Sequence, residues 1–176
     1  MKYISSYRHV AEFGRKLLER PALDDGFDLI STYIKEVVPV DRCSIFIYNR
    51  KLNLLWTTLA DGAKKIIVSG DEGIVGYCVQ NAEPIIVNDA YSDDRFNANI
   101  DKISVYKTKN LAVVPILSSS GRVLGALELL NKNDDFDEDD LKFMKFFSGY
   151  ISGYIELAML FEKDNSLLYQ DRYLHR

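Results

Sequence analysis

Apolar side chains recur every three or four residues in the N-terminal part of the chain, a spacing typical of amphipathic helices. Between residues 3 and 19 this spacing predicts one helix, which ends before Pro21 because proline cannot continue it. A second helix is predicted to begin at Asp24–Asp25 and to run to about Pro39. Its apolar stripe includes Phe27, Ile30 and Ile34.

The spacing changes after Pro39 to the apolar runs that strands favour. Residues 43–49 and 52–60 predict a hairpin, and residues 64–69 predict a third strand. A short helix over 73–83 and a brief extended segment over 84–88 follow. Residues 110–117 and 123–131 predict a second hairpin, because the connecting "SSSGR" has glycine in its turn.

The last helix is predicted to begin at the acidic residues 137–140, which favour the positive end of a helix dipole. Its apolar residues follow a near-heptad spacing, from Leu141, Met144 and Phe147 through Ile151, Ile155 and Ala158 to Phe161. That spacing predicts a seam with another helix, and we expect the terminal helices to form a homodimer as a helical bundle. Two hairpins separated by a helical crossing exclude an all-parallel sheet. The predicted fold class is therefore α+β, an antiparallel sheet with helices on one face and long terminal helices.

The stretch between the two hairpins, "NDAYSDDRFNANIDKISVYKTKNL", is too polar for a core strand. Connections longer than about a dozen residues inside a compact domain are usually functional or disordered. We interpret this stretch as the lid of a small-molecule pocket, anchored to the sheet by Tyr91, Phe96 and Tyr106.

Composition narrows the classes of function. The net charge of -4 provides no basic stripe for a phosphate backbone, so we expect no nucleic-acid partner. The sequence contains no apolar run of membrane-spanning length, and its first residues lack the apolar region of a signal peptide. We therefore expect a cytoplasmic protein with no membrane contact. Cys43 and Cys78 lie in apolar runs and are predicted to be buried, reduced thiols.

Three stretches together carry a family resemblance: "DRCSIFIYN", "DEGIVGYCVQNAEPIIVNDAYSDDRFN" and "GRVLGALELLNK". They resemble a GAF domain, most closely the subgroup found in tandem in cyclic-nucleotide phosphodiesterases and some adenylyl cyclases. The resemblance covers roughly residues 22–162 and implies a GAF/PAS-like fold. It divides the chain into an N-terminal helix (1–21), a GAF domain (22–162) and a C-terminal helical extension towards an output domain (163–176).

The resemblance also implies a ligand, since members of this subgroup close a short helix and its loop over a cyclic nucleotide. Carried over position by position, the ligand-binding residues are Ser44, Asp61, Ile74, Val75, Asp101, Ser104, Thr108 and Glu128. A structural signature follows at Asn131, Lys132, Phe136 and Asp140, whose Lys–Asp pair is expected to tie the last strand to the final helix. Two positions depart from the family: Ala60 replaces a base-stacking aromatic residue, and Leu141 replaces the last glutamate of the signature.

Simpler interpretations of these residues stay open at this point. Asp101, Ser104 and Thr108 could be solvated lid residues, Glu128 could simply face solvent, and Lys132 with the run 134–140 could be a charged helix start. Two functions remain, a small-molecule sensor and a ligand-free dimerisation module.

We expect no catalysis, no metal and no cofactor other than a possible cyclic nucleotide. The two histidines, His9 and His175, lie at the chain ends, where they cannot ligate haem or complete a catalytic triad. No clustered Cys and His would hold zinc. A bilin would need a histidine beside its cysteine, and a free methionine-sulfoxide reductase would need a set of lid cysteines, and this sequence has neither.

Overall fold

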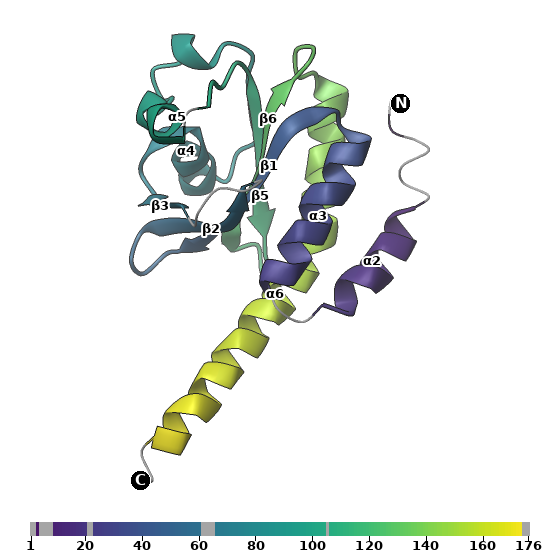
Figure 1. Ribbon diagram of the computed structural model, residues 1–176, viewed down its shortest axis with the longest axis vertical. Helices are drawn as coiled ribbons and strands as arrows, with labels where there is room; N and C mark the ends of the chain where they lie inside the picture. The colour runs from purple at the N-terminus through teal and green to yellow at the C-terminus, as the bar shows by residue number, and fades with distance from the viewer. Residues whose placement is uncertain (1–2, 4–8, 21–22, 61–65, 105, 174–176) are drawn as a thin grey trace.

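The structure is a computed structural model that describes residue 3 and residues 9–20, 23–60, 66–104 and 106–173 (Figure 1). Within these ranges, the side chains of 24, 58–60, 66, 103–104 and 161–173 are not described. The first half of the predicted N-terminal helix, including Ile4 and Tyr7, and the predicted ligand residue Asp61 therefore lie outside the described residues.

A six-stranded sheet, in the order β3-β2-β1-β6-β5-β4, forms the centre of the domain. The strands are β1 (Val40–Asn49), β2 (Leu54–Ala60), β3 (Ile66–Ser69), β4 (Ile85–Val87), β5 (Leu111–Leu117) and β6 (Val123–Lys132). Every neighbouring pair is antiparallel, so both predicted hairpins and the antiparallel sheet are confirmed. The first and last strands of the two hairpins, β1 and β6, pair at the middle of the sheet.

Helices cover both faces of the sheet, so the expectation that they lie on one face is wrong (Figure 1). On one face lie α3 (Leu23–Val37) and α6 (Glu138–Tyr173), and α2 (Val10–Leu18) packs against these two helices. On the other face lie α4 (Gly73–Asn81) and α5 (Ala98–Ser104). Two separate cores result, because the centre strands bury side chains on both faces, as Ile45 and Phe46 show.

The apolar spacing of α6 serves the core of its own domain. The predicted seam residues from Leu141 to Ala158 are buried against the sheet, α2 and α3. These residues therefore do contact other helices, as the spacing predicted, but the helices are α2 and α3 of the same chain. The homodimer stays a prediction. A different set of apolar side chains on α6 remains exposed: Phe146, Tyr150, Leu157 and Leu160.

The predicted lid contains local structure that the sequence analysis did not resolve. It comprises the short 3₁₀ helix η1 (Ala90–Ser92) and α5, joined by a turn. The rings of Tyr91 and Phe96 meet edge to face, with 5.3 Å between their centroids. Phe96 also packs against the core beneath α4. Cys43 and Cys78 are both buried, as predicted, and neither forms a disulfide with a described residue.

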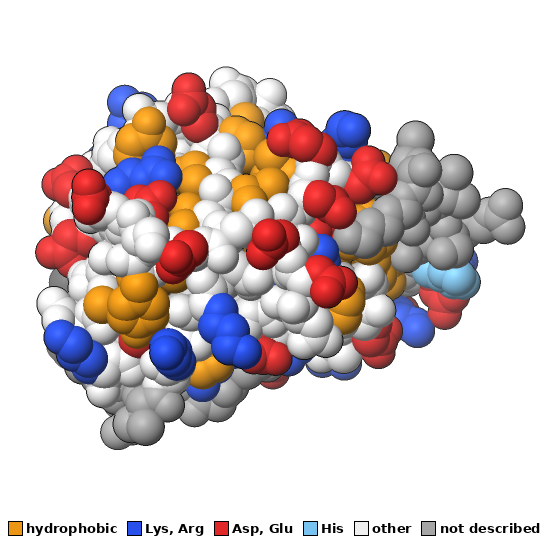
Figure 2. All heavy atoms as spheres, turned by 90° about the horizontal axis from the view of Figure 1, so that it is seen from above, with side chains coloured by type: hydrophobic (Ala, Val, Ile, Leu, Met, Phe, Trp, Pro, Cys, Tyr) orange, Lys and Arg blue, Asp and Glu red, His pale blue; other side chains and the backbone are white. Residues whose placement is uncertain are grey.

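Charges of both signs are interspersed over the face of the molecule seen from above (Figure 2). In the part of the chain that the structure describes, no helix is both long and apolar enough to cross a membrane.

Candidate functional site

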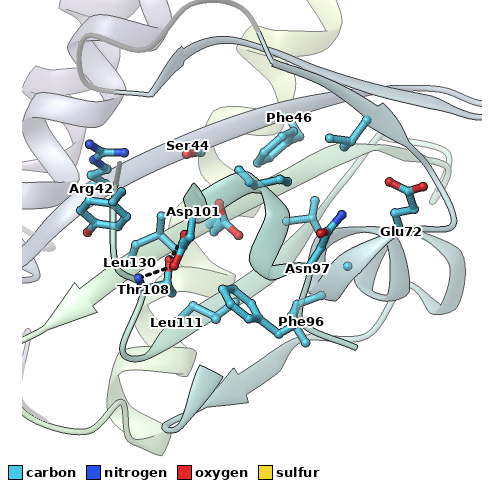
Figure 3. Close-up of a pocket in the computed structure, with 17 residues that line it drawn as sticks. Arg42, Ser44, Phe46, Glu72, Phe96, Asn97, Asp101, Thr108, Leu111 and Leu130 are labelled. Carbon is cyan, nitrogen blue, oxygen red and sulfur yellow. Dashed lines mark hydrogen bonds between the residues drawn. The ribbon is translucent and has the colours of Figure 1, made fainter. Parts of the chain in front are cut away.

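A cavity of about 90 Å³ lies between the sheet and the lid (Figure 3). Its floor is formed by side chains of β1, β5 and β6, and its other walls by the start of α4 and by the lid. Small-molecule pockets usually enclose roughly 300–1,000 Å³. A ligand as large as a nucleotide would therefore enter only if the lid moved away from the sheet.

The floor follows from the pairing of β1 with β6. Ser44 is the register partner of Glu128, and Arg42 is the partner of Leu130. Because side chains alternate along a strand, Arg42, Ser44 and Phe46 all point to the same face of the sheet. All of these residues line the cavity, together with Leu111 of the neighbouring strand β5.

Glu128 is the polar centre of this floor. The pKa of its carboxyl is raised from 4.5 to about 7, mainly by burial and also by the negative charge of Asp101, while a hydrogen bond with the Ser44 hydroxyl acts in the opposite direction. The simpler interpretation, that the Glu128 side chain points into free solvent, is therefore wrong, because this side chain lines the cavity. At neutral pH this carboxyl can accept a hydrogen bond when ionised and donate one when protonated.

Asp101, the predicted ligand carboxylate of the lid, is already occupied by the protein itself. It accepts hydrogen bonds from the Thr108 amide at 2.7 Å, the Thr108 hydroxyl at 2.8 Å and the Tyr91 hydroxyl at 3.0 Å. The bond with Asp101 is also the largest cause that raises the pKa of Tyr91. Asp101 and Thr108 are buried, so the interpretation as solvated lid residues is wrong for both. Their contacts hold α5 to the strand that follows it.

The start of α4 forms the wall opposite the floor. Gly73 begins this helix with φ at 72°, a conformation that glycine adopts without strain. Ile74 and Val75 follow as buried residues that line the cavity. Glu72 precedes them and also lines it, so an acidic side chain stands at the positive end of this helix.

The structural signature connects the lid to β6. Asn131 adopts φ 55°, and its side chain accepts from the Lys109 amide at 2.7 Å and donates to the Lys107 carbonyl at 2.9 Å. These two residues flank Thr108, so Asn131 holds the end of the lid from both sides. Asn110 is a further connection, because its side chain bonds to the amide and the carbonyl of Lys132.

The predicted Lys–Asp pair is present, with 2.8 Å between Lys132 Nζ and Asp140 Oδ2. Its side chains are only 4% and 0% exposed, so neither a surface ion pair nor a solvated helix start describes it. The Tyr3 hydroxyl donates to the other carboxylate oxygen of Asp140, and the Tyr3 ring lies against Phe143. The pair therefore joins three parts of the chain: β6, the first turn of α6 and the N-terminal segment.

The structure thus brings together most of the predicted site. Six of the predicted ligand residues line the cavity with described side chains, four on the sheet or lid and two on α4: Ser44, Asp101, Thr108, Glu128, Ile74 and Val75. Ser104 ends α5, with a side chain outside the described residues. Phe136 and Leu141 are buried, the latter because it faces the core where a glutamate was expected.

Sequence reasoning missed Arg42, Phe46, Glu72 and Asn97, which also line the cavity. The alternation of β1 could have indicated Arg42 and Phe46, since each lies two residues from Ser44. Among the described residues, no group of three or more His, Cys, Asp or Glu is arranged to hold a metal ion.

Comparison with known proteins agrees with this architecture. Residues 22–155 match the model of a protein family that is described as "GAF domain". A dual 3',5'-cyclic-AMP and -GMP phosphodiesterase 11A from Takifugu rubripes is 32% identical over 182 residues, which cover 91% of this chain and 20% of that protein. The chain thus spans about a fifth of this relative's length.

Solved structures share the fold. The GAF domain of a phosphoenolpyruvate-protein phosphotransferase from Coxiella burnetii superposes with a TM-score of 0.81 at 18% identity, covering 93% of this chain and 99% of that one. A free methionine-R-sulfoxide reductase from Neisseria meningitidis superposes at 0.73 with 14% identity, covering 88% and 90%. At such identities the likeness shows the fold alone, and the fold occurs in an enzyme as well as in other proteins.

Proposed function

This chain belongs to the GAF domain family and is homologous to cyclic-nucleotide phosphodiesterases, and from that premise we propose that it is a non-catalytic sensor domain of a signalling protein. It binds a small molecule, cyclic AMP or cyclic GMP, beneath the lid. The observation that supports this most directly is the cavity floor, where Glu128 and Ser44 present a carboxylate and a hydroxyl to an otherwise apolar pocket. A purine has N–H groups that can donate hydrogen bonds to such a carboxylate.

Release of the lid is the step that ligand binding requires. The cavity is smaller than a nucleotide needs, and the contacts of Asp101 with Thr108 and Tyr91 hold the lid down. We expect a ligand to rearrange these contacts, because Asp101 cannot serve both the lid and a purine in its present geometry.

A path from the lid to the helices supports the sensor proposal. Asn131 holds both neighbours of Thr108, and the next residue, Lys132, forms the buried pair with Asp140 at the start of α6. Movement of the lid would therefore act on the position of α6 relative to the sheet. Helix displacement of this kind is a common two-state element in signalling.

Isothermal titration with cyclic AMP and cyclic GMP tests the proposal. We expect one of them to bind, and Glu128→Ala to weaken that binding by at least about tenfold, as loss of a hydrogen bond to a charged group implies. Glu83→Ala is the matched control, because Glu83 is exposed outside the cavity, and it should bind as the wild type does. At about 100 times the dissociation constant the ligand should stabilise the fold by about 2.7 kcal/mol. No heat and no rise in melting temperature with either nucleotide would refute the cyclic-nucleotide proposal.

Dimerisation through the terminal helices is the second candidate function, and an exposed stripe on α6 favours it. Phe146, Tyr150, Leu157 and Leu160 are 43%, 38%, 59% and 55% exposed. Their spacing of four, seven and three residues follows the heptad pattern of a two-helix interface. This is the surface through which we propose the homodimer, instead of the buried seam that the sequence suggested.

Sedimentation velocity distinguishes the dimer from a monomer. Leu157→Glu should dissociate the dimer without unfolding the domain, because the side chain is exposed. Leu52→Glu is the control, since Leu52 is 66% exposed in the turn between β1 and β2, away from α6. A wild-type protein that sediments as a monomer at high concentration would refute the dimer proposal.

A further inference from the structure

A groove of about 910 Å³ lies at the end of the sheet where β1 ends and β6 begins. The pairing of these two central strands stops at Ile47 and Gly125. Beyond this point β1 still pairs with β2 as far as Asn49, and β6 pairs with β5 from Val123 onwards. The two hairpins therefore separate at this end of the sheet, and residues of both turns line the groove.

The apolar walls of the groove belong to both faces of the sheet. Trp56 and Met159 pack against the core beneath α3 and α6, whereas Tyr48 and Val123 pack against the core beneath α4. All four side chains are half-buried, so each keeps part of its apolar surface open. A partner that covers this surface gains the free energy of apolar burial.

The charged side chains that line the groove are all positive among the described residues. Arg50 and Lys51 come from the turn between β1 and β2, and Arg122 comes from the turn between β5 and β6. None of the three forms an ion pair with another described residue. In a chain with a net charge of -4, this local excess of positive charge favours an anionic partner.

The strand edges indicate the shape of that partner. On the side that faces the groove, β1 beyond Ile47 and β6 before Gly125 have no described strand partner. Unpaired strand edges offer backbone N–H and C=O groups to an extended peptide, which can add as a further strand. The side chains of such a strand alternate between the two faces of the sheet, where the apolar walls lie.

The acidic run of this chain, residues 134–140, is not available as the partner segment of a second copy. Phe136 and Asp140 within this run are 3% and 0% exposed in the fold of their own domain. The occupant that fits the groove is therefore a segment of a different protein.

We propose that this groove binds an extended acidic segment of a partner protein, in which aspartates or glutamates alternate with apolar side chains. The segment adds a strand between β1 and β6. Its apolar side chains cover Trp56 and Val123, and its carboxylates pair with Arg50 and Arg122. The groove and the cavity beneath the lid share no lining residue, so this docking function does not depend on the proposed cyclic nucleotide.

The test begins with a library of random short peptides, displayed on phage and selected on the intact wild-type chain. The double variant Arg50→Glu/Arg122→Glu is used for counter-selection, because both side chains are exposed and their replacement should leave the fold intact. We expect the enriched peptides to contain an excess of aspartate and glutamate, with apolar residues at alternate positions.

Trp56 then reports on binding, because it is the only tryptophan of the chain and lines the groove. The most enriched peptide, synthesised without tryptophan, should change the tryptophan emission saturably. The affinity should fall by at least about tenfold in Arg50→Glu/Arg122→Glu, which loses two ion pairs and gains two repulsions. Lys109→Glu/Lys145→Glu is the matched control, since both lysines are exposed outside the groove, and it should bind as the wild type does.

Three results would overturn the proposal. In the first, selection enriches no peptide on the wild type relative to the counter-selected variant. In the second, the enriched peptides contain no excess of acidic residues. In the third, a thymidine oligonucleotide or vesicles containing a phosphoinositide change the Trp56 emission while the peptide does not, so that the positive charges serve another polyanion.

Discussion

The buried pair between Lys132 and Asp140 permits a quantitative prediction. Lys132→Met leaves the Asp140 carboxylate, which is 0% exposed, without its counter-charge. Breaking one side of a buried pair typically costs about 3–5 kcal/mol, because the remaining charge stays desolvated. For a domain of this size, that cost corresponds to a fall in melting temperature of roughly 6–20 °C. Urea denaturation of wild type and variant measures the loss directly through the midpoint and slope.

Two comparisons make the result decisive. Lys142→Met disrupts the pair with Asp139 on the same helix, whose side chains are 67% and 39% exposed, and should cost less than about 1 kcal/mol. The double variant Lys132→Met/Asp140→Asn removes both charges and should recover at least half of the stability lost in Lys132→Met. If Lys132→Met lowers the free energy of unfolding no more than Lys142→Met does, the Asp140 carboxylate is not destabilised by burial without its counter-charge. The argument from the burial of this pair is then wrong.

Three further predictions concern the pocket and its surroundings. The folded pKa of Glu128 is raised to about 7 from 4.5, so its contribution to stability is complete below pH 4.5 and is lost as the pH rises to 7. The stability of Glu128→Gln relative to wild type should therefore increase over that range, by on the order of 3 kcal/mol in urea titrations, and a flat difference would contradict the raised pKa. Asn131→Ala should cost about 1–3 kcal/mol and speed hydrogen exchange at the Lys109 amide, whereas unchanged exchange would show that the lid does not depend on this side chain. Burial raises the pKa of Cys78 to about 12, so iodoacetamide at mildly alkaline pH should leave this thiol unmodified in the native protein, as mass spectrometry can check.

The sheet was predictable from sequence because its strands are bounded by clear turns and its two hairpins are local. Which face of the sheet each helix covers could not be predicted, because a short helix such as α4 can lie on either face with the same apolar spacing. The buried stripe of α6 illustrates a related limit. A heptad-like repeat shows that one helix face is covered, but a neighbouring chain and the same chain's sheet produce the same repeat.

The site also has a part that the sequence predicts and a part that it does not. Residues on strands, such as Ser44 and Glu128, keep their relation because the register of β1 and β6 fixes it. The state of Asp101 depends on how the lid folds, since its partners Tyr91 and Thr108 lie ten and seven residues away along an irregular segment. Tyr3 is separated from Asp140 by 137 residues, and no local pattern connects them.

The contact of Tyr3 with Asp140 also has a mechanical consequence. Tyr3 binds at the first turn of α6, while the chain leaves the domain along the rest of that helix (Figure 1). Tension applied between Tyr3 and the far part of α6 would therefore run along the helix axis and bypass the sheet. Under such tension the Tyr3 hydrogen bond would break first, and the strands that form the pocket floor would keep their register.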